Sequence, residues 1–147
     1  MLFRSNVIGA QAVIISLPSI IIKNKIFFFD YLNNSFCDNK IINNINENFV
    51  SEIFLTDMIN DGIKNSFNIN IITKLNKLLN NFPLIVFGGI SSVKKIESIL
   101  NIKNVSAVAI GNFLTYKEHS YYDFLKIKKT NFFRKIFFKE NIFYNDK

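Results

Sequence analysis

The chain repeats one pattern four times: a short run of β-branched and other apolar residues, a turn, and a segment whose apolar residues lie three and four positions apart. Short, continuously apolar runs are typical of strands that are buried on both faces of a parallel sheet. The predicted strands span residues 10–17, 52–56, 84–87 and 106–110, and the predicted helices span residues 39–48, 69–80, 92–100 and 120–128. This alternation indicates an α/β fold in which right-handed helical crossovers join parallel strands.

One segment departs from the alternation. Residues 19–35, SIIIKNKIFFFDYLNNS, contain two β-rich runs on either side of the Lys-Asn-Lys triplet at 23–25. This arrangement predicts a β-hairpin that follows the first strand, before the chain continues to its first helix. Pro18 directly precedes the segment. Because proline has no N–H to donate in a central strand, we expect the first strand to end at Leu17.

The chain length suits one domain followed by a short tail. Of its 147 residues, 49% are hydrophobic, which is enough apolar material for a substantial core. We assign residues 1–128 to a half-barrel phosphate-binding domain, for reasons given below, and residues 129–147 to a basic, aromatic C-terminal tail. Two interpretations of the tail stay open: a basic amphipathic helix that contacts a membrane or a partner, and a loosely packed extension.

Charge and cysteine content narrow the range of partners. The formal net charge is +7, but the lysines are scattered along the chain, as expected from an AT-rich coding bias, so we predict no nucleic-acid partner. The longest apolar run is interrupted by Ser16, Pro18 and Lys23, so no integral membrane segment is expected. Cys37 is the only cysteine, which excludes an internal disulfide, and no His or Cys lies near it at metal-ligand spacing. A cytoplasmic protein without a metal or another cofactor is predicted.

Small residues follow two of the predicted strands, at the positions where ligands bind in parallel α/β folds. Gly88 and Gly89 follow the third strand, and Gly111 and Asn112 follow the fourth. Glycine lets the backbone approach a bound oxygen because it has no Cβ. Ser91 and Ser92 are both plausible N-caps for the next helix, whose free N–H groups favour an anion. Together these features predict a phosphate site, although each glycine pair taken alone is also consistent with an ordinary turn.

Two aspartates follow the second predicted strand. Asp57 comes directly after it, and Asp61 precedes Gly62. Carboxylates at such a position act as general acid or base when the pocket tunes their pKa values. The alternative is that Asp61 and Gly62 form a tight turn and that Asp57 caps the loop. His119, the only histidine, is predicted to be a surface or capping group rather than a base.

These motifs resemble the C-terminal half of the cyclase subunit of imidazole glycerol phosphate synthase. The resemblance covers residues 7–128 and rests on AQAVIIS, EIFLTDMINDGIKNSFN, PLIVFGGISSVKKIESIL and VSAVAIGNFLTYKEHS. The GNFLTYKEHS ending is more similar to the paralogous branch that assists amidation of surface-polysaccharide sugars, as in lipopolysaccharide biosynthesis. The family fold is a (β/α)8 TIM barrel, so the resemblance implies half of such a barrel, its strands five to eight, with a hairpin excursion after the first of them.

The resemblance also implies roles for individual residues. The family's phosphate-binding positions fall on Asp61, Gly62, Gly88, Gly89, Ile90, Gly111 and Asn112, and its pore threonine falls on Thr56. The family reaction is a lyase and cyclase step of histidine biosynthesis. A glutamine amidotransferase subunit delivers ammonia through the barrel to a phosphoribosyl-bearing nucleotide, and two aspartates perform the acid–base chemistry.

Departures from the family pattern bear on catalysis. Pro18 occupies the position of one catalytic aspartate, and the other belongs to a family strand that is absent from this sequence. Ile59 replaces a further family aspartate in the loop after the second predicted strand. Asp57 is a weak substitute, since nothing in the spacing requires it to act on a substrate. We therefore assign no catalytic residue and expect no cyclase activity from this chain alone.

A half-barrel leaves unpaired backbone groups on its first and last strands. The missing units would come from a chain that supplies strands one to four, from a second copy of this chain, or from sequence upstream of Met1 if the reading frame is truncated. Two functions stay open. The first is an enzyme component that binds a phosphorylated small molecule and works with a glutamine amidotransferase. The second is a non-catalytic phosphosugar-binding or scaffold half-barrel.

Overall fold

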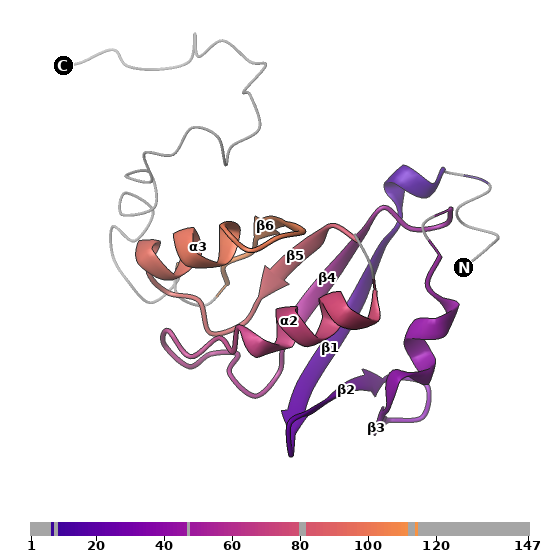
Figure 1. Ribbon diagram of the computed structural model, residues 1–147, viewed down its shortest axis with the longest axis horizontal. Helices are drawn as coiled ribbons and strands as arrows, with labels where there is room; N and C mark the ends of the chain where they lie inside the picture. Colours follow the sequence, from indigo (N-terminus) through magenta and orange to yellow (C-terminus); the bar gives the residue numbers. More distant parts are fainter. Residues whose placement is uncertain (1–6, 8, 47, 80–81, 112–113, 115–147) are drawn as a thin grey trace, which may run out of the picture.

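A six-stranded sheet in the order β3-β2-β1-β4-β5-β6 forms the centre of the molecule (Figure 1). The computed structural model describes residues 7, 9–46, 48–79, 82–111 and 114. The parallel strands are β1 (Ile14–Ile22), β4 (Glu52–Asp57), β5 (Leu84–Phe87) and β6 (Val105–Val108). The antiparallel strands are β2 (Lys25–Asp30) and β3 (Ser35–Cys37). The predicted α/β class and the parallel pairing of the four repeated strands are thus confirmed.

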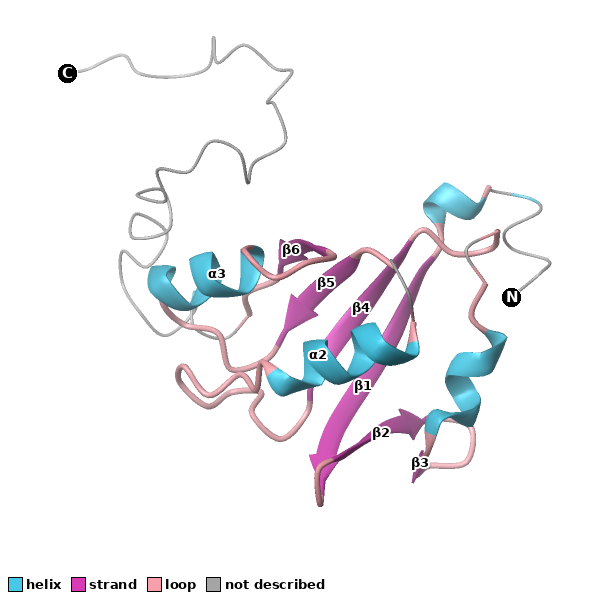
Figure 2. Ribbon diagram, viewed as in Figure 1, coloured by secondary structure: helices cyan, strands magenta, loops and turns pink. Residues whose placement is uncertain are grey.

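The helices α2 (Asn70–Leu78) and α3 (Val93–Leu100) lie on the same face of the sheet (Figure 2). Both were predicted from their apolar spacing. The 3-10 helices are η1 (Ala10–Ala12) and η2 (Asn39–Asn44). The helix predicted at 39–48 is thus present as a shorter 3-10 helix, because this segment is rich in asparagine, a poor helix former whose side chain competes for backbone hydrogen bonds. The helix predicted at 120–128, His119 and the tail at 129–147 lie outside the described residues.

The first strand differs most from its prediction, since it begins at Ile14 and continues through Pro18 to Ile22. Ser19 O accepts a hydrogen bond from Met58 N, on the side of β4. Backbone groups of successive residues point to opposite sides of a strand, so the ring nitrogen of Pro18 faces the β2 side. Pairing with β2 begins only at Ser19. No strand therefore lies opposite the nitrogen of Pro18, and its missing N–H costs the sheet no hydrogen bond. The last strand also differs, because β6 begins before the predicted 106–110 segment.

The predicted β-hairpin is confirmed, with the end of β1 as its first arm. β1 and β2 pair antiparallel up to Ile22 and Lys25. The intervening Lys23 and Asn24 have φ values of 45° and 64°. Left-handed values at both central residues are what a tight two-residue hairpin turn requires. The hairpin therefore covers the edge of β1 from Ser19 to Ile22.

The hydrophobic core lies between the sheet and the helices. Side chains along β4 alternate between the two faces of the sheet: Ile53, Leu55 and Asp57 are buried, whereas Glu52, Phe54 and Thr56 are half-buried. The buried residues of the helices are Ile71, Ile72 and Leu75 of α2 and Ile96 and Ile99 of α3. We call the opposite face of the sheet, which carries Phe54, the open face. Within the described part of the chain, no helix combines the length and apolarity needed to cross a bilayer.

Candidate functional site

The residues that follow β4, β5 and β6 gather at one end of the sheet, because these strands are parallel. We call residues 57–68, 88–92 and 109–111 the rim. Two of its loops are joined by hydrogen bonds. Phe67 N donates to Gly89 O at 3.3 Å, and Asn65 N donates to Ser91 Oγ at 3.0 Å. Ser91 Oγ also donates to Asn65 Oδ1 at 3.0 Å, so the two loops form one hydrogen-bonded unit.

Gly88 and Gly89 take up backbone conformations that side chains rarely allow, with φ values of 106° and 62°. A Cβ on Gly88 would lie 2.7 Å from Asp57 O. A Cβ on Gly89 would collide with Ser66 Oγ and lie 2.5 Å from Asn60 O. Glycine is therefore required at both positions. At both positions the absent side chain lets the backbone pack closely against the loop after β4.

Three consecutive backbone donors in the rim have no acceptor among the residues that the structure describes. The N–H groups of Gly88, Gly89 and Ile90 donate no hydrogen bond to any described residue. Gly88 and Ile90 are buried residues, and buried backbone N–H groups almost always have a partner in a native protein. Successive N–H groups in such a turn form a concavity that suits an anion. Of the two predicted N-caps, Ser92 caps α3 by accepting a hydrogen bond from Lys95 N at 3.3 Å, whereas Ser91 bonds to Asn65.

The structure brings most of the other predicted phosphate-binding residues to the same rim. Gly111 is exposed, and a Cβ on it would lie 3.0 Å from the ring of Phe87, the last residue of β5. Asp61 and Gly62 are exposed in the loop after β4, where Asp61 N donates to Asp57 O at 3.0 Å. Asn112 lies outside the described residues. The glycine corners after β4, β5 and β6 therefore share one end of the sheet.

Asp57, the weak catalytic candidate, is 1% exposed and shares the helix-facing side of β4 with Ile53 and Leu55. Its Oδ2 accepts hydrogen bonds from Asn60 Nδ2 at 2.7 Å and from Asn68 N at 2.9 Å. Its Oδ1 accepts a longer bond of 3.4 Å from Asn60 N. This arrangement corresponds to the loop-capping interpretation, and it gives an acid–base role no support. The orientation was not evident from the sequence, because Ile53, Phe54 and Leu55 are all apolar and give no alternation.

The open face carries the predicted pore residue Thr56, which is aligned with Pro18 on β1 and Phe87 on β5. The rings of Phe54 and Phe87 lie 5.7 Å apart on this face. Pro18 brings no ionisable group to the position of the family aspartate. Sequence reasoning did not single out the aromatic pair, because it depends on the register between β4 and β5. No group of three or more His, Cys, Asp and Glu side chains among the described residues is arranged to hold a metal ion.

The fold and the rim define an α/β protein with a candidate anion site at the carboxyl ends of its parallel strands. The sequence matches the family model of histidine biosynthesis proteins over residues 5–120. No curated protein matches it at a significant level. Because the family match covers most of its length, the chain belongs to the histidine biosynthesis protein family.

Proposed function

We propose that the rim binds the phosphate group of a phosphorylated sugar or nucleotide. The observation that carries the proposal is the run of N–H groups at Gly88, Gly89 and Ile90, none of which donates to a described residue. A phosphate accepts several such bonds at once, and two consecutive glycines with positive φ values form a turn of the kind in which successive N–H groups bind anions. Gly62 and Gly111, both exposed at the same rim, extend the surface on which the rest of the ligand would lie.

We further propose that the sheet is half of a (β/α)8 barrel that corresponds to strands five to eight of the cyclase subunit of imidazole glycerol phosphate synthase. Helices on one face and an open face on the other are what half of such a barrel would present. Pairing with β2 begins at Ser19, so residues 14–18 of β1 keep an edge that no described strand covers. The outer edge of β6 is likewise uncovered by any described strand. Further strands would pair at these two edges.

In this proposal the chain is a cytoplasmic enzyme component that works with a glutamine amidotransferase, in histidine biosynthesis or in the related amidation of surface sugars. The catalytic carboxylates must then come from the remaining strands, because Pro18 has no ionisable group and Asp57 is enclosed by its loop. The second candidate function is a non-catalytic phosphosugar-binding half-barrel. The rings of Phe54 and Phe87 favour it, since they occupy the open face where a substrate channel would run.

Binding is tested by titrating the chain with ribose 5-phosphate and following backbone amide signals by NMR. We expect the largest shifts at Gly88, Gly89 and Ile90, and a loss of these shifts in Gly89→Val, whose side chain would collide with the loop after β4 and displace the turn at residues 88–90. Gly9→Ala is the matched control, because Gly9 also has a positive φ of 84° and has nothing within 4 Å of its Cβ position, at the other end of β1. A ligand that leaves the amides of residues 88–90 unshifted would show that the rim binds no phosphate.

The two candidate functions differ in whether the assembled complex forms product. We would combine the chain with a separately produced four-strand half of a cyclase subunit and with a glutaminase, and measure ammonia-dependent product formation. Product formation supports the enzyme component. Ribose 5-phosphate binding without product, in a complex shown by light scattering to contain all chains, supports the non-catalytic module.

A further inference from the structure

Exposed aliphatic side chains gather at the end of the sheet where the parallel strands finish. Ile22, the last residue of β1, is 46% exposed. Met58, Ile59 and Ile63, in the loop after β4, are 38%, 55% and 55% exposed. Because β1 and β4 are parallel, both segments lie at the same end of the sheet. We call these four residues the aliphatic patch. Large apolar side chains that gather on a surface usually mark a site of interaction.

The loop after β4 is joined to β1 beside the aliphatic patch. Met58 N donates to Ser19 O at 3.1 Å, three residues before Ile22. Within the loop, Asp61 N donates to Asp57 O at 3.0 Å. These bonds occupy backbone groups and leave the aliphatic side chains outside. Their exposure is therefore a property of the folded loop and hairpin.

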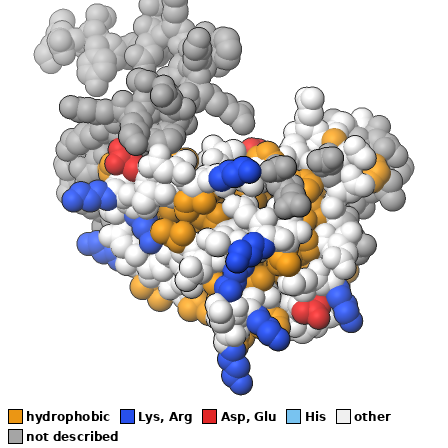
Figure 3. Space-filling view, viewed as in Figure 1, with side chains coloured by type: hydrophobic (Ala, Val, Ile, Leu, Met, Phe, Trp, Pro, Cys, Tyr) orange, Lys and Arg blue, Asp and Glu red, His pale blue; other side chains and the backbone are white. Residues whose placement is uncertain are grey.

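Two lysines lie next to the aliphatic patch. Lys23 follows Ile22 in the hairpin turn, Lys64 follows Ile63, and both lysines are exposed. Neither lysine side chain makes a hydrogen bond or an ion pair with a described residue. Asp61 is the one exposed acidic residue of the loop at 57–68, so positive charge prevails around the patch. Figure 3 shows apolar atoms along the lower left border of the molecule, with lysine side chains to either side of them.

We propose that the aliphatic patch attaches the protein to the surface of an anionic lipid bilayer. The aliphatic side chains would enter the boundary between headgroups and acyl chains, and Lys23 and Lys64 would contact the lipid phosphates. Anionic lipids attract lysines near the membrane surface, and binding strengthens with the apolar area buried in the interface.

The composition of the surface favours a bilayer over other partners. Protein interfaces are enriched in aromatic residues and depleted in lysine. Single-stranded nucleic acids bind where bases can stack on aromatic rings. None of the four side chains of the aliphatic patch is aromatic, and two lysines flank it. Aliphatic side chains on projecting loops, with lysines beside them, suit a fluid anionic surface better than either alternative.

The membrane contact goes beyond the function proposed for the rim. It depends on side chains of the hairpin and of the loop after β4, whereas the proposed phosphate site depends on the backbone N–H groups of residues 88–90. Attachment would turn the rim toward the bilayer. Either proposal can fail while the other holds.

The test is sedimentation of the full chain with vesicles of phosphatidylglycerol mixed with phosphatidylcholine. Replacing two residues of the patch, Ile59→Ser with Ile63→Ser, should lower the partition coefficient about tenfold, because two apolar side chains no longer enter the bilayer. Ile14→Ser is the matched control, since Ile14 is 50% exposed at the opposite end of β1. Urea unfolding of each variant should show unchanged stability, as the substituted side chains are exposed.

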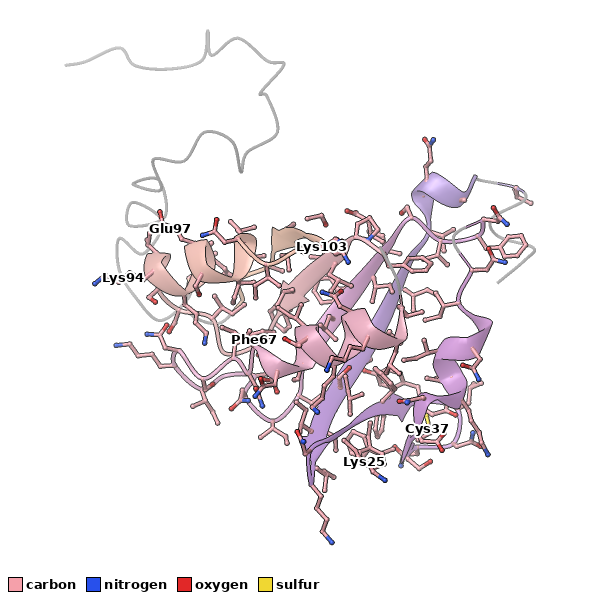
Figure 4. All side chains as sticks on the ribbon, viewed as in Figure 1. Lys25, Cys37, Phe67, Lys94, Glu97 and Lys103 are labelled. Carbon is pink, nitrogen blue, oxygen red and sulfur yellow. The ribbon has the colours of Figure 1, made fainter. Side chains whose placement is uncertain are left out.

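A second pair of variants tests the charges. Lys23→Gln with Lys64→Gln should lower binding to the anionic vesicles about tenfold and leave the weaker binding to pure phosphatidylcholine unchanged. Figure 4 shows Lys25 on the hairpin and Lys103 near the start of β6, at the amino ends of the parallel strands. Lys103 is exposed, so Lys103→Gln is the matched charge control.

Each outcome decides the proposal. Binding that falls in both double variants and persists in both controls supports it, whether or not ribose 5-phosphate shifts the amides of residues 88–90. Three results would overturn it: no sedimentation with anionic vesicles, equal binding by either double variant and the unsubstituted chain, or tighter binding to a single-stranded oligonucleotide than to the vesicles.

Discussion

Asp57 Oδ2, at the end of β4, accepts a hydrogen bond of 2.9 Å from the backbone N–H of Asn68, two residues before α2 begins. The same oxygen accepts a bond of 2.7 Å from Asn60 Nδ2. One buried carboxylate therefore fixes both ends of the loop that follows β4. This loop in turn packs against Gly89, so the shape of the rim depends on Asp57 without requiring it to contact a ligand.

Replacing Asp57 with asparagine should destabilise the protein by about 1–3 kcal/mol, because an amide NH2 would face donors that now meet a carboxylate oxygen. Urea unfolding measures the change. Asp61→Asn is the matched control, since the Asp61 side chain is exposed and only its backbone N–H bonds to Asp57. Equal stability of the two variants would contradict the loop-organising role.

Gly89→Ala should cost about 2–3 kcal/mol, because its Cβ would collide with Ser66 Oγ and Asn60 O in addition to straining a positive φ. Gly62→Ala is the control that measures the cost of the positive φ alone, without a collision. Gly62 has a φ of 79° but nothing within 4 Å of its Cβ position, so it should cost only about 1 kcal/mol. Thermal or urea unfolding of both variants gives the comparison. A Gly62→Ala penalty as large as that of Gly89→Ala would mean that loop contact at Gly89 is unimportant.

Ser92→Ala should remove the N-cap of α3 and cost about 1 kcal/mol, as the Lys95 N–H loses its acceptor. Ser98→Ala, within the same helix, is the control: Ser98 Oγ bonds only to Lys95 O on an exposed surface, and alanine is the better helix former. We expect Ser98→Ala to be neutral or slightly stabilising in urea unfolding. Opposite ranking of the two serines would refute the capping assignment.

Cys37 should react slowly with iodoacetamide at neutral pH. Burial raises the pKa of its thiol, and the negative charges of Asp30 and Asp38 raise that pKa further, so less of the reactive thiolate forms. As pH rises, alkylation of the folded chain should accelerate at higher pH than alkylation of the urea-unfolded chain. Asp38→Asn should bring the folded profile closer to the unfolded one. Coincident pH profiles for folded and unfolded protein would show that the thiol is not shielded.

The local features of the fold were predictable because neighbouring residues encode them. The apolar spacing of 69–80 and 92–100 predicted α2 and α3, and the triplet at 23–25 predicted the hairpin turn. The prediction that the first strand ends before Pro18 was wrong, because a proline interrupts a strand only where its nitrogen faces a paired neighbouring strand. That depends on the register between β1, β2 and β4, which the sequence of one strand does not contain.

The sequence by itself determined that β4 and β5 are strands, that α2 and α3 are helices, and that glycine corners follow these strands, since these features come from side-chain periodicity and backbone conformational preference. Only the tertiary structure decided that Asp57 turns toward the helices and that Gly89 lies against the loop after β4. Contacts between residues far apart in the chain follow from how the sheet and helices pack, and no local pattern encodes that packing.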